Sequence, residues 1–209
     1  MDVVRKLLIT AHPNTPPPAT VDIGREVRGL CIVLMFAAYE NLLTSVCRGL
    51  LETAVSLKVG NKSLRKGLKL FTVHGHLQSL HELSTRNIWK PKGLKIIETI
   101  ELSRSCNINV NLFPSDGSFM KQTQVTLFCE LFELGDPAAV LKEAWSKIDG
   151  IVTERNGIAH GRLTPEEVGR RYSFPEIEDV LRIWETRWLE FLINLELKAS
   201  SRDFYRVKR

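Results

Sequence analysis

The sequence lacks the short motifs that mark the common nucleotide-handling and hydrolytic enzymes. It has no G-x-x-x-x-G-K-[ST], no G-x-G-x-x-G, no H-E-x-x-H and no G-x-S-x-G. The first two cradle phosphates or dinucleotides on a glycine-rich backbone, and the other two place a zinc ion or an activated serine. Their absence argues against NTPase, dinucleotide-binding, zinc-protease and serine-hydrolase functions.

Long apolar runs and paired cysteines are missing as well. The longest apolar stretch, Leu30 to Ala38, has nine residues, about half of what a bilayer-spanning helix needs. The apolar part of the N-terminus is short and prolines follow it, so we expect no cleaved secretory signal. The cysteines Cys31, Cys47, Cys106 and Cys129 form no C-x-x-C pair. We therefore expect buried free thiols, a cytoplasmic location and no membrane.

Strand signals are weak, whereas helix signals recur along the chain. With 209 residues, 44% of them hydrophobic and 25% charged, the chain is long enough for one substantial core. We expect a Pro-containing N-terminal arm over residues 1–20, one helical domain over 21–200 and a basic, frayed tail over 201–209. The fold class is therefore all-α, a helical bundle with a long final amphipathic helix and an irregular mid-chain insertion.

Apolar periodicity and capping residues place the individual helices. Periodicity predicts helices over residues 22–57, 62–83, 95–103 and 121–134. Three later helices have start signals that combine a capping residue with proline: Asp136-Pro137, Thr164-Pro165 with Glu167, and Ser173-Phe174-Pro175-Glu176. The last two complete capping boxes. The final helix carries an apolar face with Trp184 and Trp188, which we expect to be core or dimer contacts.

The net charge of +5 is concentrated in one block. Between Lys58 and Lys95 the sequence has nine Lys or Arg residues and one acidic residue, Glu82. Such a block attracts polyanions and makes their binding salt-sensitive. We expect RNA contacts from seven of the basic side chains: Lys62, Arg65, Lys66, Lys69, Arg86, Lys90 and Lys92. The alternative, a solvated helix face followed by a basic loop, stays open.

The histidines of this block do not predict a metal site. On a helix, His74 and His76 point about 160° apart, and His81 is no better placed. We therefore expect no metal ligands in the chain.

The segment from Arg155 to Gly161 carries the chemistry that the rest of the chain lacks. Apolar residues recur every three or four positions along its helix, and Arg155 falls near the centre of this stripe, where Leu or Ile would be expected. A buried guanidinium requires an anionic partner or a site that binds anions. Asn156 and His160 lie four residues apart on one face, and Gly161 stands where helices end. The three side chains can thus line one concavity.

This pattern resembles the signature of the HEPN superfamily, which is an Arg, a polar residue that is often Asn, and a His, here with four residues between Arg155 and His160. Two segments together, Glu130 to Gly135 and Glu154 to Gly161, are similar to the RiboL-PSP type of this superfamily. A first helix with Ala37-Ala38-Tyr39-Glu40-Asn41 and a last amphipathic helix after Pro175 agree more loosely. The resemblance implies an HEPN-like helical bundle that acts as a metal-independent ribonuclease, is usually dimeric, and often belongs to toxin-antitoxin or antiviral systems. The implied partners are RNA and an antitoxin or regulatory protein.

The catalytic roles follow from the chemistry of RNA, whose 2′-OH can attack the adjacent phosphorus without a metal or cofactor. His160 would transfer protons, Arg155 would hold the phosphate and stabilise the transition state, and Asn156 would orient the ribose or His160. The resemblance adds Glu40 as an acidic residue able to pair with Arg155. One histidine cannot easily serve both sides of one phosphorus, so we expect a homodimer with a composite site. Two alternatives stay open: a buried Arg155–Glu40 ion pair that only fixes packing, and a noncatalytic RNA-binding or protein-interaction module.

Overall fold

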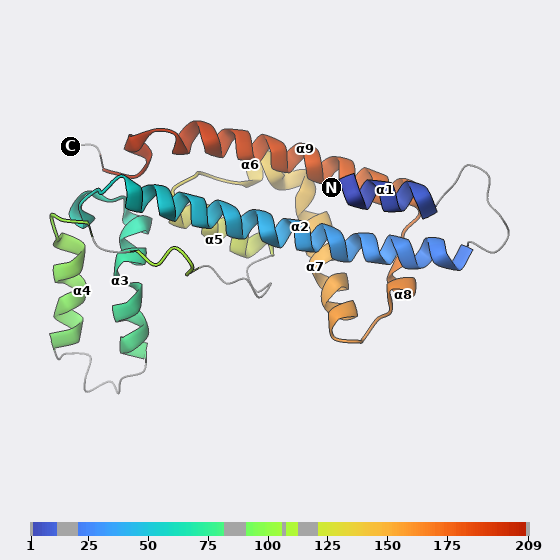
Figure 1. Cartoon of the computed structure of the whole chain (residues 1–209), viewed down its shortest axis with the longest axis horizontal. Helices are drawn as coiled ribbons and strands as arrows, with labels where there is room; N and C mark the ends of the chain where they lie inside the picture. Colours follow the sequence, from blue (N-terminus) through green and yellow to red (C-terminus); the bar gives the residue numbers. More distant parts are fainter. Residues whose placement is uncertain (1, 12–20, 82–90, 106–107, 113–120, 208–209) are drawn as a thin grey trace. The chain divides into compact units, whose positions relative to one another are not determined.

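The computed structural model describes residues 2–11, 21–81, 91–105, 108–112 and 121–207, without the side chains of 21–23, 81, 91 and 92. The regular elements in these ranges are helices (Figure 1), which confirms the all-α class. An isolated β-bridge joins Leu64 and Arg206.

Residue contacts group the chain into two compact units, where the sequence predicted one domain over residues 21–200. The first unit comprises Met1–Leu43, Ser115–Thr126 and Pro137–Ile193, and the second comprises Thr44–Pro114, Leu127–Asp136 and Asn194–Arg209. Three helices contribute residues to both units: α2 (Val21–Ser56), α5 (Gln122–Leu131) and α9 (Phe174–Ala199).

The first unit has its core between α2 and α9. Its other elements are α1 (Asp2–Ala11), α6 (Ala138–Leu141), η3 (Lys142–Ala144), α7 (Trp145–Ala159) and α8 (Pro165–Gly169). The ring centroid of Tyr39 on α2 lies 5.0 Å from that of Trp184 and 5.0 Å from that of Trp188, both on α9. All three side chains are buried. The tryptophans are therefore core residues, which is one of the two roles predicted for them.

Within the expected N-terminal arm, residues 2–11 form a helix. Along α1, Leu8 is fully buried, and Arg5 Nη2 lies 2.6 Å from Glu185 Oε2 on α9. Figure 1 shows α1 lying along α9. The Pro-containing remainder of the predicted arm, residues 12–20, lies outside the described residues.

The second unit contains α3 (Lys66–His81) and α4 (Pro91–Glu101), which run side by side in Figure 1. A short 3-10 turn, η1 (Asn61–Ser63), precedes α3, so α3 begins later than predicted. Helix α4 begins at Pro91, earlier than the predicted start at Lys95, because proline suits the first turn of a helix.

The C-terminal tail of the second unit is docked up to Val207, where the sequence suggested fraying. A 3-10 turn, η4 (Arg202–Phe204), leads into the buried pair Phe204 and Tyr205. The two rings meet edge to face at 5.0 Å. Aromatic burial thus holds a segment that its charge alone would place in solvent. Residues 208–209 lie outside the described residues.

Two of the three predicted helix starts have the expected capping geometry. Thr164 Oγ1 accepts a hydrogen bond from Glu167 N, and Glu167 Oε2 accepts one from Thr164 N at 2.7 Å. Ser173 and Glu176 make the same reciprocal pair at the start of α9. In both boxes the backbone N–H bond lowers the pKa of the glutamate.

The third predicted start is displaced by one residue. Helix α6 begins at Ala138, and its N-cap position is Pro137, where the sequence predicted Asp136. The expected continuous helix is also divided, since η3 separates α6 from α7. The apolar stripe nevertheless continues across the break, because Leu141, Ala144 and Ile148 are all buried.

The cysteines within the described residues are free and buried, as predicted. They are Cys31, Cys47 and Cys129. Burial raises the pKa of Cys31 to about 11 and that of Cys129 to about 12. Each of these thiols is therefore protonated at neutral pH and unreactive in the folded state. Cys106 lies outside the described residues.

Helix α2 is long and apolar enough over Gly24–Ser56 to cross a membrane, by length and composition alone. Buried core helices share this property. The residues that α2 buries include Met35, Phe36 and Tyr39, so its apolar character has a use within the first unit.

Candidate active site at the end of helix α7

Helix α7 ends in the geometry that the sequence predicts around Gly161. His160 is the C-cap, and Gly161 has a φ of 66°. Gly161 N donates to Ile158 O at 3.0 Å, and Arg162 N donates to Gly157 O at 2.9 Å. These two bonds form a Schellman motif, which requires a left-handed residue after the cap. The prediction that Gly161 ends the helix is confirmed.

Arg155 lies on an aromatic ring of the neighbouring helix. Its guanidinium carbon is 4.2 Å from the ring centroid of Phe36 on α2, a cation–π contact. Its Nη1 also donates to Asn156 Oδ1 at 3.1 Å. Arg155 is half-buried, while Phe36 is buried. The side chain is thus held by a ring and an amide and keeps partial access to solvent.

Glu40 does not form the ion pair considered for it. It lies one turn beyond Phe36 on α2, yet among the described residues no carboxylate oxygen comes within 4.0 Å of the Arg155 guanidinium nitrogens. Glu40 Oε1 is itself buried without a hydrogen-bond partner in the described part of the chain. The buried Arg155–Glu40 pair, one of the two alternatives to a catalytic site, is therefore not present.

Asn156 and His160 complete the group at this helix end. Asn156 is half-buried, and His160, one turn further along α7, is exposed. The backbone N–H of His160 donates to Asn156 O at 3.1 Å. The structure therefore brings a guanidinium, an amide and an accessible imidazole to one end of one helix, a set that can hold a phosphate and move a proton.

Glu154, for which the sequence predicted no role of its own, is the buried charged residue of α7. It is 8% exposed, and its Oε1 accepts a hydrogen bond from Arg171 Nη1 at 3.2 Å. Tyr172 lies beside it: burial first, and then the negative charge of Glu154, raise the pKa of Tyr172 to about 12. Glu154 thereby fastens the chain that follows α8 to the helix bearing Arg155.

The end of α7 is also held in place by α8, whose backbone packs directly against the backbone of α2. A Cβ at Gly29 would lie 1.9 Å from Pro165 O, and a Cβ at Gly169 would lie 1.8 Å from Arg25 O. Real Cβ atoms do not come this close to backbone oxygens, so glycine is required at both positions. Helix α2 therefore supports both Arg155, through Phe36, and the segment that follows α7.

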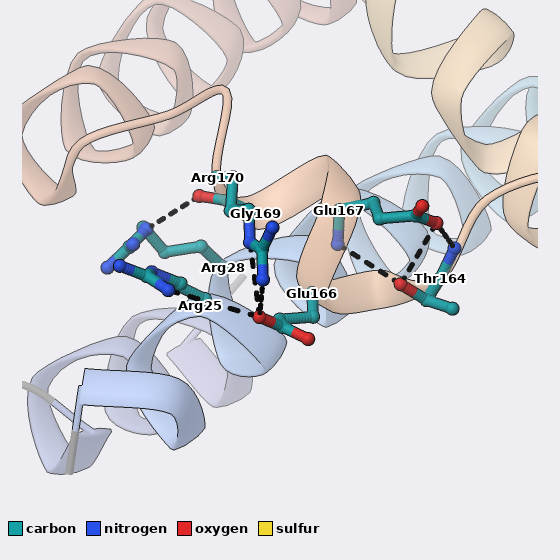
Figure 2. Close-up of polar contacts among 7 residues, drawn as sticks. All are labelled: Arg25, Arg28, Thr164, Glu166, Glu167, Gly169 and Arg170. Atoms are coloured by element: carbon teal, nitrogen blue, oxygen red, sulfur yellow. Dashed lines mark hydrogen bonds and ion pairs between the residues drawn. The ribbon is translucent and has the colours of Figure 1, made fainter.

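Arginines surround this contact between α2 and α8 (Figure 2). Arg28 Nε donates to Gly169 O at 3.1 Å and so satisfies a carbonyl at the end of α8. Burial, and secondarily the charge of Arg25, lower the pKa of Arg28. Glu166 Oε1 forms ion pairs with Arg170 Nη2 at 2.6 Å and with Arg25 Nη1 at 3.9 Å. These contacts hold α8 in place rather than forming part of the α7 group.

The basic residues predicted to bind RNA lie in the second unit and differ in their availability. Lys62 and Lys66 are exposed, and Lys69 is half-buried. Arg65 has a structural role, because it pairs with Glu133 at 3.0 Å, donates to Asp203 O and lies 5.8 Å from the centroid of the Phe204 ring. Three predicted contacts, Arg86, Lys90 and the side chain of Lys92, fall outside the described residues.

Potential metal ligands do not gather in the described part of the chain, where no three His, Cys, Asp or Glu side chains lie close enough to hold an ion. Comparisons of the chain with protein families, curated proteins and solved structures found no match.

Proposed function

We propose that this chain is a metal-independent endoribonuclease of the HEPN type, working in the cytoplasm in a toxin-antitoxin or antiviral setting. Arg155, Asn156 and His160 would form its active site. The proposal joins the resemblance of the Arg155 to Gly161 segment with the arrangement of these side chains at the end of α7.

The observation that carries the proposal is a positioned guanidinium without a carboxylate. A half-buried arginine has lost part of its hydration, and an anion beside it compensates for that loss. Arg155 has a ring and an amide as its contacts, and within the described residues no acidic side chain pairs with it. A phosphodiester would supply the missing negative charge, and the planar fork of donors matches two phosphate oxygens.

The reaction uses the nucleophile that RNA carries. The 2′-oxygen bonds to the adjacent phosphorus as its proton passes to an imidazole, and the bond from phosphorus to the 5′-oxygen breaks as that oxygen receives a proton. The products are a 2′,3′-cyclic phosphate and a 5′-hydroxyl. His160 would act in one of the two proton transfers, since an imidazole can both accept and donate a proton. Arg155 would stabilise the charge that builds on the phosphorane oxygens.

The second proton transfer calls for a second group. Because base and acid act on opposite sides of one phosphorus, a homodimer that brings two copies of the α7 end together would supply both imidazoles. Glu40, with a buried oxygen one turn from Phe36, would then help to position the arginine or the ribose rather than neutralise Arg155.

The test is cleavage of RNA in the presence of EDTA. His160→Ala should lower the rate by at least about 100-fold, the usual contribution of a proton-transfer group, while leaving thermal stability unchanged because His160 is exposed. Arg155→Lys should also lose activity, because a point charge cannot grip two oxygens. The matched controls are His74→Ala and Arg48→Lys, which alter exposed residues of the second unit.

Cleavage by the wild type only after Mg²⁺ is added would contradict the mechanism. Binding of RNA without any cleavage in EDTA would instead identify a noncatalytic RNA-binding module.

A further inference from the structure

A cleft of about 550 Å³ opens in the second unit, where the C-terminal tail meets the segment that follows α2. One wall consists of Lys58, Val59, Gly60 and Ser63, and the other consists of Arg202, Asp203, Arg206 and Val207. This volume lies within the range of about 300–1,000 Å³ that is typical of small-molecule sites.

Backbone pairing holds the two walls of the cleft together. Val207 N donates to Ser63 O at 2.9 Å, and Arg65 N donates to Tyr205 O at 3.2 Å. These bonds flank the bridge between Leu64 and Arg206. The buried side chain of Tyr205 also anchors the tail to the unit. The cleft is therefore a built feature of the unit, and not a gap beside a loose tail.

The charges around the cleft are mostly positive. Three of its lining residues are basic, namely Lys58, Arg202 and Arg206, and one, Asp203, is acidic. Arg206 Nη2 and Nε lie 2.8 and 3.0 Å from Asp203 Oδ1, so this carboxylate is already engaged. Among the described residues, the Lys58 side chain has no hydrogen bond or ion pair. A cleft with this balance attracts anions.

The lining also indicates how an anion would be recognised. None of the lining residues is aromatic, so a base would find no ring to stack on. The Ser63 hydroxyl and the cationic groups match phosphate oxygens. Exposed Lys62, next to Ser63, carries the positive charge beyond the cleft, which suits a ligand with several phosphates in a row.

We propose that this cleft is a phosphate-binding site, which takes the phosphate of a single-stranded RNA or of a free nucleotide. The site recognises the negative charge of the phosphate and does not distinguish between bases. The proposal concerns binding alone and does not require the cleavage chemistry assigned to Arg155 and His160.

The experiment measures fluorescence anisotropy of a short 2′-O-methyl oligoribonucleotide with the full chain at several salt concentrations. This probe lacks the attacking hydroxyl, so it stays intact whether or not the protein is a ribonuclease. Each phosphate contact with a single strand contributes about 0.7 to the slope of log K against log salt, or about fivefold in affinity near 0.1 M salt. Lys58→Gln should thus weaken binding about fivefold, and Lys58→Gln with Arg202→Gln about 25-fold.

Arg48→Gln is the matched control, because it removes a charge from an exposed residue of the same unit that does not line the cleft. It should change the affinity by no more than about twofold, since screened charges act weakly at a distance. Circular dichroism checks that Arg202→Gln leaves the fold intact, and Lys58→Gln, which breaks no contact, is the variant free of that concern.

Competition separates the two sources of phosphate. Displacement of the probe by adenosine monophosphate at concentrations comparable to those of a competing strand identifies a nucleotide site, and tight binding of the strand alone identifies an RNA site. Either result upholds phosphate recognition. Unchanged affinity and salt slope in the double variant, or equal competition by adenosine without phosphate, would overturn the proposal.

Discussion

Gly169→Ala should destabilise the first unit, because a Cβ at this position meets backbone that cannot move aside. The added carbon would lie 1.8 Å from Arg25 O and 2.7 Å from the carbonyl carbon. Helix α8 would have to shift away from α2, and with it the Gly169 carbonyl that accepts a bond from Arg28.

The size of the effect follows from these two losses. Overpacking typically costs about 1–3 kcal/mol, and a hydrogen bond to a charged group contributes about 1.5 kcal/mol or more. Because the two are coupled, we expect a loss of at least about 2 kcal/mol. For a chain of this length, this corresponds to a fall in Tm of about 4–8 °C.

Gly150→Ala is the matched control for this substitution. Gly150 lies within α7, in the same unit, and a Cβ there meets nothing within 4 Å. Alanine is favoured over glycine inside helices by about 0.5–1 kcal/mol, so this variant should be as stable as the wild type or more stable. The same substitution should therefore act with opposite signs at two positions of one unit.

Urea unfolding followed by tryptophan fluorescence and circular dichroism measures both variants. Trp145, Trp184 and Trp188 all lie in the first unit and report on it. If Gly169→Ala unfolds at the urea concentration of the wild type, the close contact between α8 and α2 is refuted. An equal loss in Gly150→Ala would mean that any added methyl is harmful, and the reasoning from distance would be wrong.

Two further predictions concern groups whose pKa values are raised. The folded state raises the pKa of Tyr172 from 10 to about 12 by burial and by the charge of Glu154, so it keeps a proton that the unfolded state has lost. Stability should then fall as pH rises from about 10 to about 12, and Tyr172→Phe should lessen this fall in urea midpoints measured against pH. The buried thiols of Cys31, Cys47 and Cys129 should react with an aromatic disulfide reagent at pH 8 only after urea is added; rapid reaction of all three in the native protein would contradict their burial.

Features determined within a few residues could be predicted from the sequence. The boxes at Thr164 and Ser173 and the helix end at Gly161 each depend on bonds that span only a few positions. The residues of each motif are therefore sufficient to predict its geometry. The start at Asp136 is displaced by one residue, because Pro137 stands at the N-cap and not at the first helical position.

Burial along α7 could not be predicted in the same way, because periodicity assumes a single buried face. Ala159, an apolar residue one turn after Arg155 on the face predicted to be buried, is exposed, whereas Glu154 and Gly157 lie off that face and are buried. The reason is the returning chain: Leu163 packs on Gly157, where a Cβ would come within 2.7 Å of it, and Arg171 reaches Glu154. No pattern within α7 indicates that a later segment covers its side.

The aromatic residues of the C-terminal tail indicate that the tail docks, whereas its charge suggested fraying. Phe204 and Tyr205 stand among basic residues, and two adjacent aromatics in a polar tail indicate an anchoring point. Their burial places Arg202 and Arg206 opposite Lys58. The basic block and the tail, separate in the sequence, therefore contribute to one cleft.

The way Arg155 is held bears directly on whether it can act on a phosphate. A carboxylate in contact with it would occupy its donors and neutralise its charge, and a phosphate would have to displace that partner. The ring of Phe36 instead fixes the position of the guanidinium from its face and takes none of its N–H groups. Asn156 engages one nitrogen, Nη1. Phe36→Leu should therefore lower the cleavage rate although the charge of Arg155 is retained. The substitution removes the ring that orients the guanidinium.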